Sequence, residues 1–288
     1  MQSLKKIFHL YIQSNTFQKG AALGYFAVFA LIPIAIIIIS VLGIFFGSGT
    51  VSSEFFSQFK ELLGSEAAHQ IQTIINNHHT SHKSILTTIT GIIMLIVSAS
   101  KIVIQLHNAF NDIYSIKIKP KNGLILFLKR KAFALIILVI LFTILVLSTT
   151  ISTFLQRFTP EITGSNQLLQ ILEHLFSFAI TALIFSLMYK TLGDAVIHWK
   201  PAMIGGIVTA ILFLIGKVII AQIIAQSHIE TTFGQASVLA LIMLWVFYLS
   251  QIIFLGACFV KVIGDAIYKP VRPSSEAVRV LHKEVSES

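Results

Sequence analysis

The chain has 288 residues, of which 55% are hydrophobic and only 11% are charged, and its mean hydropathy is +0.85. Soluble domains carry about 25% charged residues, so a water-exposed globular surface is excluded. Intrinsic disorder is excluded as well, because the chain contains 23 Phe and disordered chains are poor in aromatic side chains. The composition therefore predicts a protein whose solvent is largely lipid.

Apolar runs along the chain predict six membrane-spanning helices. A helix rises 1.5 Å per residue, so about 20 apolar residues cross the roughly 30 Å hydrocarbon core. The predicted spans cover residues 22–46, 85–106, 132–155, 175–192, 201–225 and 236–260. The second and fourth spans each hold a lysine near one end, where a long side chain can carry its charge to the headgroups. We predict an all-α, polytopic membrane protein with one six-helix domain over residues 1–270 and a polar cytoplasmic tail over 271–288.

The distribution of lysine and arginine between the loops predicts the orientation. With the N-terminus in the cytoplasm, six spans place 17 of these residues inside and 3 outside, while Lys217 lies within a span. This asymmetry follows the positive-inside rule, so both termini are predicted to be cytoplasmic. The rule also accounts for the net charge of +9. The basic cluster from Lys117 to Lys131 matches no known nucleic-acid-binding module, so no nucleic-acid partner is expected.

The longest external loop, residues 47–84, predicts one or two amphipathic helices, because apolar residues recur there at helical spacing. Leu4 to Tyr11 shows a similar pattern and predicts a short interfacial helix on the inside. The loop also contains four histidines, among which His78 and His82 have the i, i+4 spacing of metal ligands. No cysteine lies nearby, and a solvated loop is the favoured interpretation. We therefore expect no metal and no cofactor.

Lys217 is the most informative single residue, because it lies deep within the fifth span. A charge near the middle of a span costs at least about 2.5 kcal/mol, so it normally faces a bundle interior, a partner or water. Two interpretations remain open. Lys217 either presents a cation to an anionic substrate or an ion path, or it forms a structural pair or extends to the surface.

A polar stripe follows the second span, with residues spaced 3, 4, 3 and 4 apart on one helix face. Its members are Ser98, Lys101, Gln105, Asn108 and Asp112. The stripe either lines a water-filled vestibule on the cytoplasmic side or marks a helix end that emerges into water with an internal ion pair. Asn111 and Tyr114 lie beside it.

Two further features concern the first span. Pro33 interrupts it and predicts a helix kink, which is either structural or part of a substrate site. Gly20 and Gly24 have the small-residue spacing that lets two helices approach closely.

Enzyme chemistry has no visible set of residues in the sequence. We find no phosphate-binding loop, nucleophile elbow or zinc-protease motif, and the single cysteine, Cys258, lies in an apolar run where a buried thiol is expected. The acidic residues predicted to be cytoplasmic are scattered among different segments, and His198 has no partner nearby in sequence. We therefore predict a protein that is not an enzyme.

Several segments together resemble the YihY/BrkB family of membrane proteins. They are Lys19–Pro33, Ala109–Tyr114, Pro201–Lys217, Phe233–Gln235, Leu244–Tyr248 and Leu255–Ala257. One departure is Ala30 before Leu31, where the family commonly has Ser. The resemblance implies an integral, multi-pass protein of the bacterial inner membrane with six spans. The family was once named ribonuclease BN, a label later regarded as a misassignment; one member is associated with serum resistance and another with transport of a lipopolysaccharide precursor.

Two hypotheses for the function follow. The first is a transporter or flippase-like protein for an anionic lipid or envelope precursor, in which Lys217 attracts the anionic group and the polar stripe hydrates the inner half of the path. The second is a non-transporting structural protein of the envelope, in which Lys217 is paired and sealed from water. Ribonuclease activity is not expected. The expected partners are membrane lipids, including an anionic lipid or lipopolysaccharide precursor, and no oligomeric state is predicted.

Overall fold

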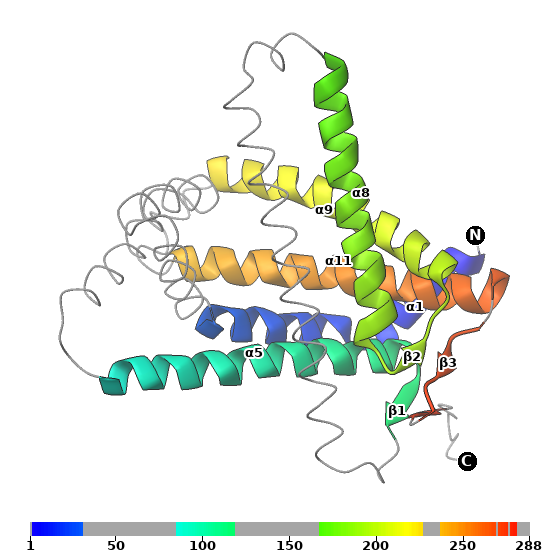
Figure 1. Cartoon of the computed structure of the whole chain (residues 1–288), viewed down its shortest axis with the longest axis horizontal. Coiled ribbons are helices and arrows are strands. Elements are labelled where there is room, and N and C mark those ends of the chain that lie inside the picture. The colour runs from blue at the N-terminus through cyan, green and yellow to red at the C-terminus, as the bar shows by residue number, and fades with distance from the viewer. Residues whose placement is uncertain are drawn as a thin grey trace. The chain divides into compact units, whose positions relative to one another are not determined.

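The structure is a computed structural model, and it describes residues 2–30, 85–118, 167–226, 237–268, 270–275 and 277–280. Five labelled helices make up most of this part (Figure 1): α1 (Gln2–Gln13), α5 (Ile85–Ile113), α8 (Gln167–Leu192), α9 (Trp199–Gln226) and α11 (Ser237–Ile267). Residues 16–30 are helical as well. Pro33, the third predicted span and the external loop with its histidines lie outside the described residues.

Three of these helices are long and apolar enough to cross a membrane. Their apolar stretches are Leu175–Leu192, Trp199–Ile219 and Leu239–Ile267. The first coincides with the fourth predicted span, and the other two overlap the fifth and sixth. Helix α5 covers the predicted second span and continues to Ile113. The prediction was an all-α protein with six spans. The structure is mostly helical in its described part, and the six-span topology and the cytoplasmic termini stay predictions.

The described part of the chain also contains four short strands, which the all-α prediction did not include. Strand β1 (Ile116–Ile118) pairs antiparallel with β4 (Ala277–Arg279), and β2 (Ala195–Val196) pairs antiparallel with β3 (Arg272–Pro273). In Figure 1, β1, β2 and β3 gather at the C-terminal ends of α5 and α8. Part of the segment predicted as a polar tail therefore pairs with the strands that follow α5 and α8.

The chain forms two compact units, each built from separate stretches of sequence. Unit one comprises Met1–Thr16, Leu106–Phe213 and Ile252–Ser288, and unit two comprises Phe17–Gln105 and Leu214–Gln251. Helices α5, α9 and α11 therefore contribute residues to both units. The strands, the cluster of His107, Asn111 and Asp194, and the contact between Tyr189 and Thr209 described below all belong to unit one.

The ends of α1 and α5 are each closed by a residue with a positive φ angle. Asn15 has φ 51° and Ser115 has φ 56°, a conformation that Asn tolerates better than most residues. The N–H of Ser115 donates to the carbonyl of Asp112 at 3.0 Å, and the Ser115 carbonyl accepts from the N–H of Val280 at 2.8 Å. The turn at Ser115 thus redirects the chain from α5 into β1 and joins it to the C-terminal segment.

Aromatic side chains fill the core of unit one. Phe110, Tyr114, Tyr189 and Phe254 are fully buried. The ring centroids of Phe110 and Tyr189 lie 5.6 Å apart, and those of Phe110 and Tyr114 lie 6.0 Å apart, within the range of favourable aromatic pairs. The contact between Phe110 and Tyr189 joins α5 to α8.

In unit two, the helix over residues 16–30 packs closely on α11. A Cβ atom added to Gly24 would lie 3.1 Å from the carbonyl oxygen of Met243, so the backbones approach as the glycine spacing predicts. The rings of Phe17 and Phe247 lie 6.4 Å apart in the same unit.

Candidate functional site

A buried polar cluster lies at the C-terminal end of α5. His107 and Asn111 are one helical turn apart on α5, and Asp194 follows the end of α8 in the connection to α9. The side chain of Asp194 is 7% exposed and that of His107 is 19% exposed, while Asn111 is buried. The cluster therefore joins two segments that lie 83 residues apart in the sequence.

The three side chains form a closed set of hydrogen bonds. Nδ2 of Asn111 donates to Oδ2 of Asp194 at 2.9 Å, and Oδ1 of Asn111 accepts from the backbone N–H of Asp194 at 2.8 Å. Nε2 of His107 lies 3.1 Å from Oδ2 of Asp194, and its Nδ1 lies 3.4 Å from Nδ2 of Asn111. The tautomer with its proton on Nε2 satisfies both histidine contacts, since Nε2 then donates and Nδ1 accepts.

The backbone carbonyl of Asp194 extends the cluster to the C-terminal segment. It accepts a hydrogen bond from the N–H of Ser274 at 2.9 Å, next to the β2–β3 pair. One residue thus binds α5 through its side chain and the C-terminal segment through its backbone. This arrangement fixes the connection between α8 and α9.

Tyr114 lies beside this cluster with its hydroxyl buried. Its ring is close to Gly193, where an added Cβ would lie 3.2 Å from the ring. Its hydroxyl has no hydrogen-bond partner in the described part of the chain. Burial raises the pKa of Tyr114 well above its usual value of 10.0, with smaller contributions from Tyr189 and Cys258.

A second buried polar contact joins α8, α9 and α11. The hydroxyl groups of Tyr189 and Thr209 lie 2.6 Å apart, and the Tyr189 hydroxyl donates to the carbonyl of Ile253 at 2.9 Å. Gly256 provides the space, because an added Cβ would collide with both hydroxyl groups. A small residue at this position lets the Tyr189 hydroxyl of α8 contact both Thr209 of α9 and the Ile253 carbonyl of α11.

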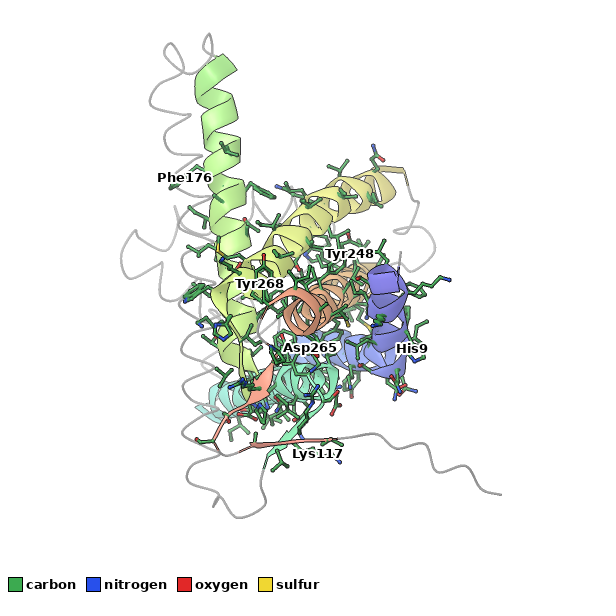
Figure 2. The ribbon with its side chains drawn as sticks, turned by 90° about the vertical axis from the view of Figure 1, so that its right-hand side faces the viewer. His9, Lys117, Phe176, Tyr248, Asp265 and Tyr268 are labelled. Atoms are coloured by element: carbon green, nitrogen blue, oxygen red, sulfur yellow. The ribbon has the colours of Figure 1, made fainter. Side chains whose placement is uncertain are left out.

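An ion pair closes the C-terminal end of α11. Nζ of Lys261 lies 3.0 Å from Oδ2 of Asp265, one helical turn away, and Nη2 of Arg279 on β4 lies 3.9 Å from the same oxygen. Oδ1 of Asp265 accepts from the N–H of Val271 at 3.0 Å. Figure 2 shows Asp265 and Tyr268 at this end of α11 and Lys117 on β1. Asp265 therefore holds the returning C-terminal segment against the helix.

The groups of the cluster at α5 are occupied mainly with one another. The carboxylate, amide and imidazole of the cluster at α5 bond to one another, which leaves few lone pairs or protons for a ligand. Within the described ranges, no group of three His, Cys, Asp or Glu side chains is arranged to hold a metal ion.

The structure leaves Lys217 exposed on α9. Leu214, Ile215, Val218 and Ile219 around it are 46–58% exposed, so the ammonium group stands on an apolar surface of unit two. Among the described residues no carboxylate forms an ion pair with Lys217.

The polar stripe is divided between the two units. Ser98 is buried, Lys101 is exposed and Gln105 is partly exposed in unit two, whereas Asn108 and Asp112 are exposed in unit one. Four of the five stripe residues are at least partly exposed, and whether they line a vestibule stays a prediction.

The buried polar face of α5, formed by His107 and Asn111, was not predicted from the sequence. His107 and Asn111 precede the stripe members Asn108 and Asp112 by one residue each, so spacing alone does not separate the two faces. The one indication in the sequence was that Asn111 lies within Ala109–Tyr114, a segment that resembles the family. Nothing near Asp194 in the sequence marks it as the partner.

Comparisons with known proteins agree with this picture of an apolar helical protein. The family model described as "Virulence factor BrkB" matches residues 7–279. The UPF0761 membrane protein of Teredinibacter turnerae is 25% identical over 272 residues, which cover 93% of this chain and 61% of that protein. A UPF0761 membrane protein of Pseudomonas aeruginosa is 24% identical over 257 residues, covering 88% of this chain and 60% of that protein.

The relatives differ in length. The chain spans about three fifths of the two proteins above, but the UPF0761 membrane protein of Mannheimia succiniciproducens is 25% identical over 273 residues, which cover 92% of each chain. No solved structure matches the chain.

Proposed function

Because the chain belongs to the BrkB family of membrane proteins, we propose that it moves an anionic lipid or envelope precursor across the bacterial inner membrane. In this proposal the chain crosses that membrane six times and has both termini in the cytoplasm. The observation that supports it most directly is the exposed Lys217 within the apolar stretch Trp199–Ile219 of α9.

The physical argument concerns the cost of charge in hydrocarbon. An ammonium group at this depth costs at least about 2.5 kcal/mol when it is unpaired, and an anionic headgroup at the same depth is disfavoured as well. The two costs partly cancel when the headgroup meets Lys217. A cation on an accessible surface of α9 would therefore lower the barrier for an anionic lipid more than for a neutral one.

The polar stripe on α5 is proposed to serve the inner half of the path. Lys101, Gln105, Asn108 and Asp112 are all at least partly exposed, and in this proposal they hydrate the inner half of the path. Their row runs toward the C-terminal end of α5, which is the predicted cytoplasmic end. No enzymatic step and no cofactor is needed in this proposal.

The proposal is tested by measuring lipid movement in liposomes that contain the purified full-length chain and fluorescent phosphatidylglycerol. Lys217→Met removes the cation that offsets the charge of the headgroup, and we expect the barrier to rise by about 1.4 kcal/mol. This rise corresponds to lipid movement that is about tenfold slower. Lys217→Arg should keep most of the rate. Lys200→Met is the matched control on the same helix, because Lys200 lies in the first turn of α9 and is exposed.

Two results would contradict the proposal. Equal rates for the unchanged chain and Lys217→Met would remove Lys217 from the mechanism. Liposomes with the unchanged chain that move phosphatidylglycerol no faster than protein-free liposomes would remove transport of this lipid class.

A non-transporting structural role is the second candidate, and one observation favours it. The side chains of His107, Asn111 and Asp194 satisfy one another, as expected of groups that hold helices together. This candidate predicts no lipid movement above the protein-free rate, so the same measurement separates the two functions.

A further inference from the structure

Helix α1 carries two apolar faces, and only one of them packs on the protein. Ile7 and Tyr11, one helical turn apart, are 4% and 8% exposed. Leu4, Phe8 and Ile12 share a neighbouring face and are 62%, 62% and 55% exposed. A helix that only packed on unit one would turn polar residues outward, so the second face requires its own apolar environment.

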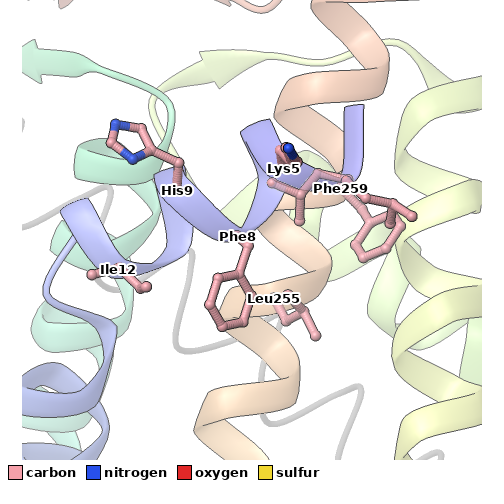
Figure 3. A pocket seen from close by; sticks show the side chains of 8 residues that line it. Lys5, Phe8, His9, Ile12, Leu255 and Phe259 are labelled. Carbon is pink, nitrogen blue, oxygen red and sulfur yellow. The ribbon is translucent and has the colours of Figure 1, made fainter. Parts of the chain in front are cut away.

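The exposed face of α1 forms one wall of a shallow groove (Figure 3). The groove has a volume of about 660 Å³, and Leu255 and Phe259 of α11 complete its lining. In Figure 3 the ring of Phe8 points toward Leu255, and Phe259 lies near Lys5. The volume is within the range of about 300–1,000 Å³ that is typical of small-molecule sites.

The polar edge of the groove is basic. Lys5, Lys6 and His9 are exposed on α1, and Lys5 and His9 line the groove. Helix α1 contains no acidic residue. An apolar channel with a cationic edge matches a molecule that has a hydrocarbon chain and an anionic head.

We propose that this groove binds one anionic phospholipid of the membrane, with an acyl chain along Phe8, Ile12 and Leu255 and the phosphate near Lys5 and Lys6. Leu255 and Phe259 belong to the apolar stretch Leu239–Ile267, so the groove opens where acyl chains are available. A second copy of α1 is disfavoured in the groove, because its own Lys5 and Lys6 would bring like charges together. The site is independent of transport, since a bound lipid need not be moved.

The proposal is tested with the full-length chain in nanodiscs that contain a photoactivatable phospholipid with a diazirine on its acyl chain. Peptides that contain residues 4–12 or 252–260 should be labelled more strongly by phosphatidylglycerol than by phosphatidylcholine. The double change Lys5→Gln and Lys6→Gln should lower labelling by phosphatidylglycerol about thirtyfold, since each near-surface cation contributes about 1 kcal/mol and about 1.4 kcal/mol corresponds to a factor of ten.

A second pair of changes tests the apolar wall. Leu4→Ser with Phe8→Ser should lower labelling by both lipids several-fold. The matched control is Leu175→Ser with Phe176→Ser, because these α8 residues are 60% and 66% exposed and lie outside the groove. Figure 2 shows Phe176 on α8.

Three results would overturn the proposal. They are equal labelling by the two headgroups, labelling that both sets of groove changes leave unaltered, and cross-links between two copies of the chain at this groove in place of lipid. Labelling that prefers phosphatidylglycerol and falls only with the groove changes would support it. Reaction of the buried thiol of Cys258 with a dye during heating shows whether each variant is folded.

Discussion

Asn111 binds Asp194 twice, donating to its carboxylate at 2.9 Å and accepting from its backbone N–H at 2.8 Å across 83 residues of sequence. This pair connects the end of α5 to the α8–α9 connection, and His107 completes it. Because the groups are buried, removing one of them leaves the others without partners, and the cost exceeds the value of a single hydrogen bond.

The pair predicts a large difference between two asparagines that are three residues apart. Asn111→Ala should lower the free energy of unfolding by about 2–4 kcal/mol, because it leaves a buried carboxylate and a buried N–H unpaired. Asn108→Ala should change it by less than about 0.5 kcal/mol, because Asn108 is exposed. The measurement is denaturant unfolding in detergent, with the reaction of a dye with Cys258, the only cysteine of the chain, as the readout of unfolding. Similar effects at both positions would contradict the buried pair.

The hydroxyl contact between Tyr189 and Thr209 predicts coupling between α8 and α9. Tyr189→Phe and Thr209→Val should each destabilise the fold, and the double variant should lose less than the sum of the two changes. The expected coupling is about 0.6 kcal/mol, the average for side-chain hydrogen bonds between membrane helices. Additive effects in the double-mutant cycle would show that the 2.6 Å contact contributes nothing.

Two glycines of α11 should differ in their tolerance of a methyl group. Gly256→Ala should destabilise the protein by about 1–3 kcal/mol, because the added Cβ collides with the hydroxyl groups of Thr209 and Tyr189. Gly264→Ala is the matched control, since its Cβ would meet Val271 and Pro201 at 3.5 and 3.7 Å, which are ordinary contact distances. Thermal unfolding of the two variants in the same detergent compares them, and equal melting temperatures would contradict the prediction.

Tyr114 should make the fold sensitive to high pH. Burial raises the pKa of Tyr114 in the folded state, so above about pH 10 the unfolded chain loses a proton that the folded chain retains. Ionisation of the unfolded phenol therefore lowers stability as the pH rises. Tyr114→Phe should reduce this loss between pH 9 and 11, and it should not destabilise the protein at pH 7, because the buried hydroxyl has no partner among the described residues. Parallel pH profiles for the two proteins would contradict this assignment.

The helices were largely predictable from sequence, because the thickness of the bilayer sets the number of apolar residues that a span needs. A span needs about 20 apolar residues, and the runs at 175–192, 201–225 and 236–260 meet this requirement without any knowledge of their neighbours. Helix α8 ends at Leu192, where the predicted fourth span ends. This requirement concerns one continuous segment of the chain, so it can be recognised from the sequence alone.

The strands and the buried cluster were not predictable in the same way. Pairing of β1 with β4 depends on residues that lie more than 150 positions apart, and strands of two or three residues have no periodicity to detect. Along α5, the spacing identified Asn108 and Asp112, whereas burial of Asn111 depends on the distant Asp194. The family block Ala109–Tyr114 contained the correct asparagine, but not its partner.

The central claim is that water and anionic headgroups reach Lys217 within the membrane. It is tested by a Lys217→Cys change in a Cys258→Ser background, reconstituted in liposomes and treated with a water-soluble maleimide. Lys200→Cys gives the rate of an exposed position at the end of α9, and Val218→Cys gives that of an apolar neighbour that is 58% exposed. The account predicts that the Lys217→Cys variant reacts at a rate close to that of Lys200→Cys. A rate as low as that of Val218→Cys would contradict it, because position 217 would then face hydrocarbon without water.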